Sequence, residues 1–225
     1  MIPLMIFPAD PADEAQLARI AEHLRSGGLL ACPTETIYGL SASADSRGVD
    51  SVRAMKGRRD EHPFLVLLPQ GLTPASRMDP GGLVWPEVAV RLAEAFWPGP
   101  LTLVLPDPEH AFPPGIRNGN GGVAVRVSSH PFIQALMRVW NRPLISTSAN
   151  QAGEPVGQGA DQVRNALEGR PGTYRLWIAD GGELAVSPPS TIVDCTGEQA
   201  RILREGAIGA DRLNPVLKRD IHDRG

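Results

Sequence analysis

Cysteine is scarce in this chain, with two among 225 residues, Cys32 and Cys195. Neither belongs to a C-x-x-C pair or to a Cys/His spacing typical of zinc ligands, which argues against a zinc site. Each ends a short apolar run, LLAC or TIVDC. We therefore expect both to be buried, reduced thiols.

Long apolar runs are also missing. None approaches the roughly 20 residues that a membrane-spanning helix needs. The first residues, MIPLMIFPADPADE, contain no basic segment and soon reach acids and prolines, unlike a secretory signal. We therefore expect a cytoplasmic protein without membrane contact.

The chain lacks an excess of basic charge and is poor in aromatic residues. Its formal net charge is −3, and aromatic residues make up 5%. Proteins whose main role is RNA binding usually combine a basic surface with aromatic stacking platforms. The composition argues against that role, although a local basic patch is compatible with it.

Familiar catalytic signatures are absent too. The motifs G-x-S-x-G, G-x-x-x-x-G-K-[ST] and G-x-G-x-x-G do not occur. The stretch NGNGG at 118–122 is rich in glycine but has the spacing of no known phosphate loop. The five histidines are dispersed, and His130 is interpreted as a residue at the start of a helix. No general base is evident.

Short apolar strands alternate with amphipathic helices along the chain, which predicts one α/β domain with a mixed sheet. Asp10 is expected to cap the first helix, and Gly27 and Gly28 to end it. We expect the domain to span residues 1–209, followed by a polar tail, 210–225. The other expected helices are 49–59, 87–96, 131–140 and 162–167, and the expected strands are 29–32, 64–68, 101–105, 123–127, 144–145, 175–179, 191–195 and 201–203.

Polar segments adjoin three of these strands, at 33–39, 146–150 and 187–191. Ligands of α/β proteins bind in loops beyond strand ends, so a site is expected there. PLISTSAN, 143–150, passes from a buried strand directly to three hydroxyls and an amide. Such residues either make caps and turns or bind ligands. PTETIYGLSASA, 33–44, is expected to be a polar turn.

Three charged or polar features, one of them a cluster of three cations, have alternative interpretations. Lys56, Arg58 and Arg59 could stabilise the C-terminal end of a helix dipole or hold phosphates. Arg126, inside the apolar strand VAVRV, could face solvent or line a cleft and bind a carboxylate. Ser190, after two prolines, could belong to a turn or contact a ligand.

Eight segments carry a family resemblance: PTETIYGL, KGR, WPGPLTLVL, VAVRVSSHP, PLISTSANQAGEPV, DGG, PSTIVD and ILREGAI. In this order, over residues 15–210, they resemble the YrdC-type threonylcarbamoyl-AMP synthases. The resemblance implies an α/β domain with a twisted mixed sheet, flanking helices and a large concave cleft. It also implies a nucleotidyltransferase that makes threonylcarbamoyl-adenylate and pyrophosphate from L-threonine, bicarbonate or CO2, and ATP. Other proteins would then transfer the threonylcarbamoyl group to adenosine 37 of tRNA (t6A).

The same resemblance implies roles for individual residues. The catalytic residues would be Lys56 and Arg58. ATP would be bound by Lys56, Arg58, Ser148, Asn150 and Arg204. Threonine would be bound by Thr34, Arg126, Ser146 and Ser190. Mg²⁺ would accompany ATP, and no metal site made by the protein itself is expected.

The chain departs from the family pattern at two positions. Arg59 stands where the family often has the proline of K-G-R-P, and Leu67 stands where some members have a histidine near threonine. The second change bears on threonine affinity or selectivity. We also expect a short form, without the extra C-terminal domain of longer members.

Three rival interpretations are compatible with the same residues. The first is an RNA-binding module, or a weak tRNA contact, that uses Lys56, Arg58, Arg59 and Arg126 on a concave surface. The second is an enzyme that transfers carbamoyl groups from carbamoyl phosphate, although such domains lie within much larger chains with zinc-finger-like cysteines. The third is a paralogue that keeps the fold without the activity.

Overall fold

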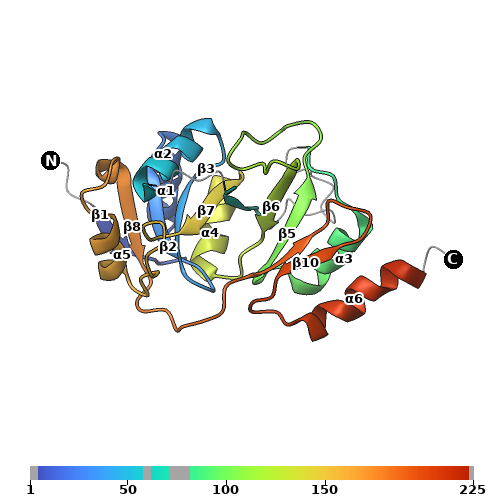
Figure 1. The fold of residues 1–225 in the computed structure, drawn as a ribbon. Helices are drawn as coiled ribbons and strands as arrows, with labels where there is room; N and C mark the ends of the chain where they lie inside the picture. The colour runs from blue at the N-terminus through green and yellow to red at the C-terminus, as the bar shows by residue number, and fades with distance from the viewer. Residues whose placement is uncertain (1–4, 58–61, 71–81, 223–225) are drawn as a thin grey trace.

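The computed structural model describes residues 5–57, 62–70 and 82–222. Within these residues one mixed sheet of ten strands runs across the molecule, in the order β1-β8-β2-β3-β7-β4-β6-β5-β9-β10 (Figure 1). The strands are β1 (Met5–Pro8), β2 (Leu29–Pro33), β3 (Tyr38–Ser43), β4 (Leu65–Leu67), β5 (Leu101–Pro106), β6 (Gly122–Arg126), β7 (Leu144–Ser148), β8 (Leu176–Asp180), β9 (Thr191–Asp194) and β10 (Arg201–Arg204). The helices are α1 (Glu14–Arg25), α2 (Ser46–Lys56), α3 (Glu87–Phe96), α4 (Pro131–Trp140), α5 (Ala160–Leu167) and α6 (Ala210–His222), with a short 3₁₀ turn, η2 (Thr173–Arg175). The predicted fold class, one α/β domain with a mixed sheet, is confirmed.

The helices cover the two faces of the sheet unequally. Apolar residues of α2, α3, α5 and α6 pack against one face and form the larger core cluster. On the other face, α1 and α4 pack together over β2, β7 and β4 in a smaller cluster that includes Leu30, Leu67 and Leu144. Beyond these two helices, the same face borders a cavity lined by residues of β6, β5 and β9.

Side chains of β5 and β6 alternate between the core and this cavity, as expected for strands. Leu103 and Val125 belong to the larger core cluster. Their neighbours in sequence line the cavity: Thr102, Val104, Ala124 and Arg126. Of the two interpretations of Arg126, the structure therefore supports a residue that lines a cleft.

The segment PTETIYGLSASA is a turn only in its first part, contrary to the sequence prediction. Its second part is β3, which pairs antiparallel with both β2 and β7. Tyr38, Leu40 and Ala42 are buried, and so are the small residues between them. A strand that is buried on both faces shows no alternation of polar and apolar residues, so the pattern concealed it.

Helix α1 begins later than predicted. Asp13, not Asp10, is the N-cap, and its Oδ1 accepts a hydrogen bond from Gln16 N at 2.9 Å. Asp10 Oδ1 instead accepts from Ala12 N at 2.8 Å. Both aspartates can bond to a backbone N–H two or three residues ahead, so local sequence did not distinguish the turn from the cap.

The polar tail that was expected from residue 210 forms helix α6 up to His222. Leu213 is fully buried, and Val216 and Leu217 pack against the larger core cluster. These residues are spaced three and four apart, which is the helical period. The polar residues between them and Pro215 obscured this pattern in the sequence.

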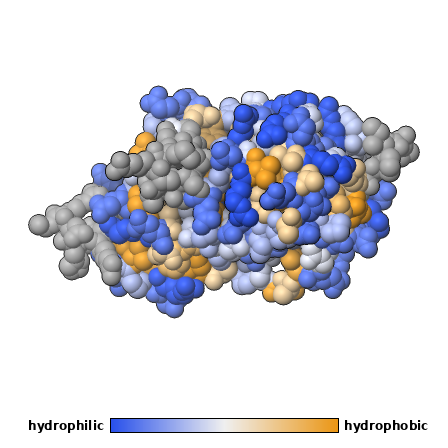
Figure 2. Space-filling model, turned by 180° about the vertical axis from the view of Figure 1, so that it is seen from behind, coloured by the Kyte–Doolittle hydropathy of each residue, from blue (hydrophilic) through white to orange (hydrophobic). Residues whose placement is uncertain are grey.

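Both cysteines are buried and free, as predicted. Burial raises the pKa of the Cys32 thiol to about 12, although a hydrogen bond with Ser41 opposes the shift. No helix among residues 5–57, 62–70 and 82–222 is long and apolar enough to cross a membrane. Seen from behind, the surface is mostly hydrophilic, with hydrophobic residues in separate patches (Figure 2).

Gly48 allows the start of α2 to approach the end of β3. A Cβ atom at this position would lie 1.9 Å from the carbonyl oxygen of Ser43. The backbone N–H of Gly48 also donates to the N-cap residue Asp45 at 2.8 Å. The contact fixes the position of α2, and therefore of Lys56 at its other end.

We expect Gly48→Ala to lower the free energy of unfolding by about 2–3 kcal/mol, because a methyl group would overlap a backbone atom that a side-chain rotation cannot move. Chemical denaturation measures this change. Gly119→Ala is the matched control, since a Cβ at Gly119 meets nothing within 4 Å. Equal stabilities of the two variants would show that α2 can move away from β3 at little cost.

Candidate active site

Lys56, the last residue of α2, reaches the end of β7. Its Nζ donates to the carbonyl oxygens of Ser148 at 2.5 Å and Asn150 at 2.9 Å. It also lies 3.0 Å from Asn150 Oδ1 and 3.3 Å from Ser148 Oγ, and the Ser148 hydroxyl donates to Asn150 Oδ1 at 2.6 Å. The structure thus brings together three of the four predicted ATP ligands that come from the KGR and PLISTSAN segments. The fourth, Arg58, lies outside the described residues, as does Arg59.

The backbone around this cluster favours the contact. Gly57 adopts a left-handed conformation, φ +60°, and ends α2 directly after Lys56. On the other side, β7 continues to Ser148, three residues beyond its predicted end. Asn150 Nδ2 donates to the carbonyl oxygen of Glu154, which ties down the following loop. The Lys56 side chain is therefore held by two residues at the end of the PLISTSAN segment, Ser148 and Asn150.

A cavity of about 520 Å³ adjoins this cluster. Such a volume is ordinary for a small-molecule site. It is lined by six of the predicted site residues: Thr34, Arg126, Ser146, Ser148, Ser190 and Arg204. Lys56 and Asn150 are not lining residues, and they meet the cavity through Ser148. All four predicted threonine ligands therefore border one space.

Thr34 organises the turn between β2 and β3. Its Oγ1 accepts from the N–H groups of Thr36 and Ile37, each at 3.2 Å, and donates to Ile37 O at 2.7 Å. The hydroxyl is thus already engaged within the turn. Next to it, a Cβ at Gly39 would lie 3.0 Å from Ser146 Oγ. Glycine at this position keeps open the space in front of the Ser146 hydroxyl.

Ser190 and Arg204 form a second polar group at the start of β9. Arg204 donates to Ser190 O from Nε at 3.1 Å and from Nη2 at 2.8 Å. The hydroxyl of Ser190 lies 2.9 Å from Thr102 Oγ1. Ser190 is thus held in place by two neighbouring strands. Arg204, which the resemblance assigned to ATP, lies against a predicted threonine ligand, and its role in ATP binding stays a prediction.

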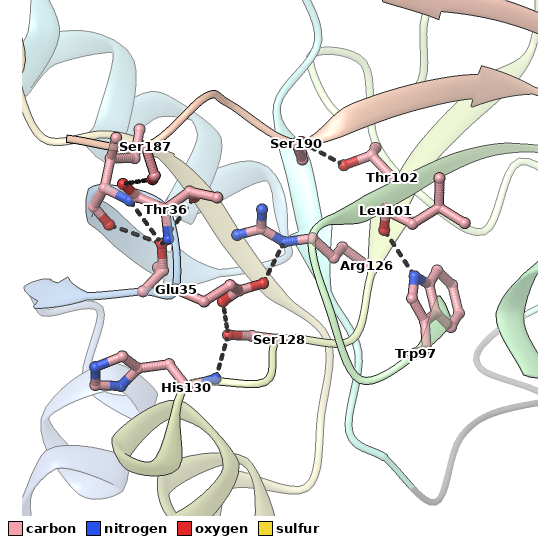
Figure 3. A network of polar contacts seen from close by, with 12 residues as sticks. Glu35, Thr36, Trp97, Leu101, Thr102, Arg126, Ser128, His130, Ser187 and Ser190 are labelled. Carbon is pink, nitrogen blue, oxygen red and sulfur yellow. Dashed lines mark hydrogen bonds and ion pairs between the residues drawn. The ribbon is translucent and has the colours of Figure 1, made fainter. Parts of the chain in front are cut away.

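Arg126 is 3% exposed and has an acidic neighbour (Figure 3). Its Nε lies 3.7 Å from Glu35 Oε1, and Glu35 Oε2 accepts a hydrogen bond from the Ser128 hydroxyl. Burial lowers the pKa of Arg126, while the charge of Glu35 raises it and that of Arg204 lowers it. The guanidinium remains a cation, because an arginine side chain is not deprotonated in proteins.

Glu35 was missed by sequence reasoning. The signal was present, because an acidic residue lies between two threonines in a polar segment that follows a buried strand. Leu67, by contrast, is fully buried in the smaller core cluster and does not line the cavity. The residue that the family resemblance placed near threonine thus belongs to the core.

The described part of the chain contains no group of three His, Cys, Asp or Glu side chains placed to hold a metal ion. The polar groups at the cavity are instead hydroxyls, amides and cations. Such a set is suited to bind anionic and zwitterionic ligands rather than a bare metal ion.

Several known proteins are similar to this chain in sequence and in fold. The threonylcarbamoyl-AMP synthase of Bacillus subtilis is 34% identical over 206 residues, which cover 91% of this chain and 57% of that protein. The putative threonylcarbamoyl-AMP synthase of Mycobacterium tuberculosis is 34% identical over 214 residues, 93% of each chain. The crystal structure of Pyrococcus abyssi Sua5 complexed with L-threonine superposes with a TM-score of 0.83 at 32% identity, covering 96% of this chain and 61% of that one.

The chain therefore spans less than two thirds of the Bacillus and Pyrococcus proteins and nearly the whole length of the Mycobacterium protein. The family described as "Telomere recombination", Sua5/YciO/YrdC, matches residues 22–206. This range contains every predicted site residue, from Thr34 to Arg204. The extent of the match, together with the shared fold, shows that the chain belongs to the Sua5/YciO/YrdC family.

Proposed function

We propose that this protein is an L-threonylcarbamoyl-AMP synthase. It would condense L-threonine, bicarbonate or CO2, and ATP to threonylcarbamoyl-adenylate and pyrophosphate, for t6A formation at tRNA position 37. The observation that carries the proposal is one cavity that is lined both by a buried arginine, Arg126, and by Ser148, whose carbonyl oxygen accepts from Lys56 Nζ. The relatives' names and the threonine complex of a homologue support it.

On the amino-acid side, Arg126 would bind the threonine carboxylate. A guanidinium offers two parallel N–H groups that match the two carboxylate oxygens. Thr34, Ser146 and Ser190 would surround the rest of the amino acid. Because serine lacks only one methyl group, the site would discriminate against it by only about 1–3 kcal/mol.

On the nucleotide side, Lys56, Arg58, Ser148, Asn150 and Arg204 would bind ATP. The deprotonated amine of threonine adds to CO2 and gives up one proton to water. An oxygen of the resulting carbamate then attacks the α-phosphate, and the bond to the leaving pyrophosphate breaks. This phosphoryl step needs little proton transfer, and its rate depends on positioning and on neutralised charge. Mg²⁺ would arrive with ATP, held mainly by phosphate oxygens and water, and would supply part of that neutralisation.

The proposed location is the cytoplasm, and the proposed partners are the proteins that transfer the threonylcarbamoyl group to tRNA. RNA binding as the main function is less well supported. Lys56 is 4% exposed and Arg126 3% exposed, so neither cation is available to a phosphate backbone at the surface. A steep salt dependence of RNA affinity would nevertheless support that alternative.

The first test mixes the purified protein with ATP, Mg²⁺, bicarbonate and L-threonine. We expect pyrophosphate release that requires threonine, together with threonylcarbamoyl-adenylate detected by mass spectrometry. A reaction without threonine is the control. Bound ATP without any product would contradict the proposal and favour an inactive paralogue or an RNA-binding role.

We expect Lys56→Met to lower kcat by about 100-fold or more, because one preorganised cation is lost at the transferring phosphate. The variant should also unfold more easily, since the oxygens of Ser148 and Asn150 lose their buried donor. Steady-state kinetics and thermal unfolding separate the two effects. The control is Lys218→Met, at an exposed site on α6. Wild-type kcat in a folded Lys56→Met variant would rule out the catalytic role.

We expect Arg126→Lys to raise the KM for threonine by roughly 10–100-fold and to leave the KM for ATP nearly unchanged. A lysine keeps the charge but cannot bind a carboxylate through two parallel N–H groups. The two KM values are measured by pyrophosphate release, with Arg201→Lys, at an exposed position of β10, as the control. If threonine KM stays at the wild-type value, Arg126 does not bind the carboxylate.

A further inference from the structure

Glu35 lies in the turn between β2 and β3, and its carboxylate points toward Arg126 on one side and Ser128 on the other (Figure 3). Oε2 accepts from the Ser128 hydroxyl, and Oε1 lies 3.7 Å from Arg126 Nε. Ser128 is 3% exposed, and its Oγ also accepts from the backbone N–H of His130 at 3.2 Å. The carboxylate is therefore anchored next to the first turn of α4.

In the Glu35–Arg126 pair, two buried atoms lack a hydrogen-bond partner among the described residues: Glu35 Oε1 and Arg126 Nε. One is an acceptor and the other a donor, and both belong to charged groups. Leaving such atoms unpaired in a buried site is costly. A movement of roughly 0.5–1 Å would bring them to hydrogen-bond distance.

The arrangement leaves the two terminal amino groups of the Arg126 guanidinium for a ligand. Arg126 lines the cavity, whereas Glu35 does not. Because Glu35 lies against Nε of the guanidinium, the two terminal amino groups remain for a carboxylate that enters the cavity. Their positions are the ones that a bound carboxylate would need for a two-point contact.

We propose that Glu35 is a positioning residue for Arg126, and that Ser128 acts by holding Glu35. Glu35 fixes the Nε side of the guanidinium so that the terminal amino groups meet the carboxylate of the amino-acid substrate. The Nε–Oε1 pair closes to a hydrogen bond when that carboxylate is bound. This inference rests on the proposed function, since it assigns the carboxylate of the amino acid to Arg126.

A purely structural role for Glu35 predicts a different result. If Glu35 only compensated the buried charge of Arg126, its loss would lower the stability of the protein and weaken the binding of all ligands of the cavity alike. If Glu35 positions Arg126, its loss weakens only ligands that have a carboxylate. A ligand pair that differs in this group alone separates the two roles.

L-Threonine and L-threoninol, in which CH2OH replaces the carboxylate, form such a pair. We expect Glu35→Gln, which keeps the size and a hydrogen-bonding oxygen, to raise the Kd for L-threonine by roughly 10-fold and to leave that for L-threoninol within about twofold. NMR titration with ATP and Mg²⁺ present measures both constants. Glu168→Gln, at an exposed position after α5, is the control and should bind as the wild type does.

Two further variants keep the test decisive if Glu35→Gln is poorly folded. Ser128→Ala should raise the Kd for L-threonine by roughly 2–5-fold and leave the Kd for L-threoninol nearly unchanged, because it removes the donor to Glu35 Oε2. The double variant Glu35→Gln/Arg126→Lys should bind threonine no more weakly than Arg126→Lys alone, since the two residues act through one contact.

Wild-type affinity for threonine in Glu35→Gln, or equal losses for threonine and threoninol, would overturn the positioning role. Fully additive losses in the double variant would overturn it as well. In both cases the wild-type protein would still make threonylcarbamoyl-adenylate, and the proposed function would stand. A wild-type protein that makes no adenylate and binds no threonine would overturn the proposed function and the positioning role together.

Discussion

A sheet of ten strands has two faces that must be covered, and the helices of the described residues cover them unequally. One face is packed by α2, α3, α5 and α6, and the other is covered by α1 and α4 over only part of its width. The uncovered part borders the cavity, and some of its alternate positions carry polar side chains that face this space. Arg126 and Thr102 occupy such positions, so the cavity follows from the arrangement of helices on the sheet.

Two buried cations near the cavity, Lys56 and Arg126, are held in different ways. Lys56 is anchored by backbone and side-chain oxygens at the end of β7, whereas Arg126 has a carboxylate, Glu35, beside it. A buried cation is tolerated only where such groups replace its hydration. Because β7 carries Ser146 at one place and Ser148 two residues further on, one strand links the proposed amino-acid side to the proposed nucleotide side.

Much of the fold was predictable from local pattern. The strands at 101–105 and 123–127 and the helices at 87–96 and 131–140 were identified from their period and flanking residues, and they agree closely with the structure. Strand β3 and helix α6 were not predicted. A strand of small residues that is buried on both faces has weak periodicity, and so does a helix with a narrow apolar stripe. In both, contacts with distant residues decide the conformation, and local propensity does not show them.

For the candidate site, the residues could be predicted from the sequence, but their contacts could not. Residue pattern and family resemblance predicted Lys56, Ser148 and Arg126 as site residues, but they did not show that the Thr34 hydroxyl is engaged in its own turn or that Glu35 faces Arg126. The Thr34 contacts are local to the turn, whereas the contact of Glu35 with Arg126 depends on how the turn after β2 lies against the end of β6, a strand distant in sequence. Sequence thus indicates which residue types bind a ligand, whereas the orientation of each group, and with it the choice of ligand atom, is a property of the assembled sheet.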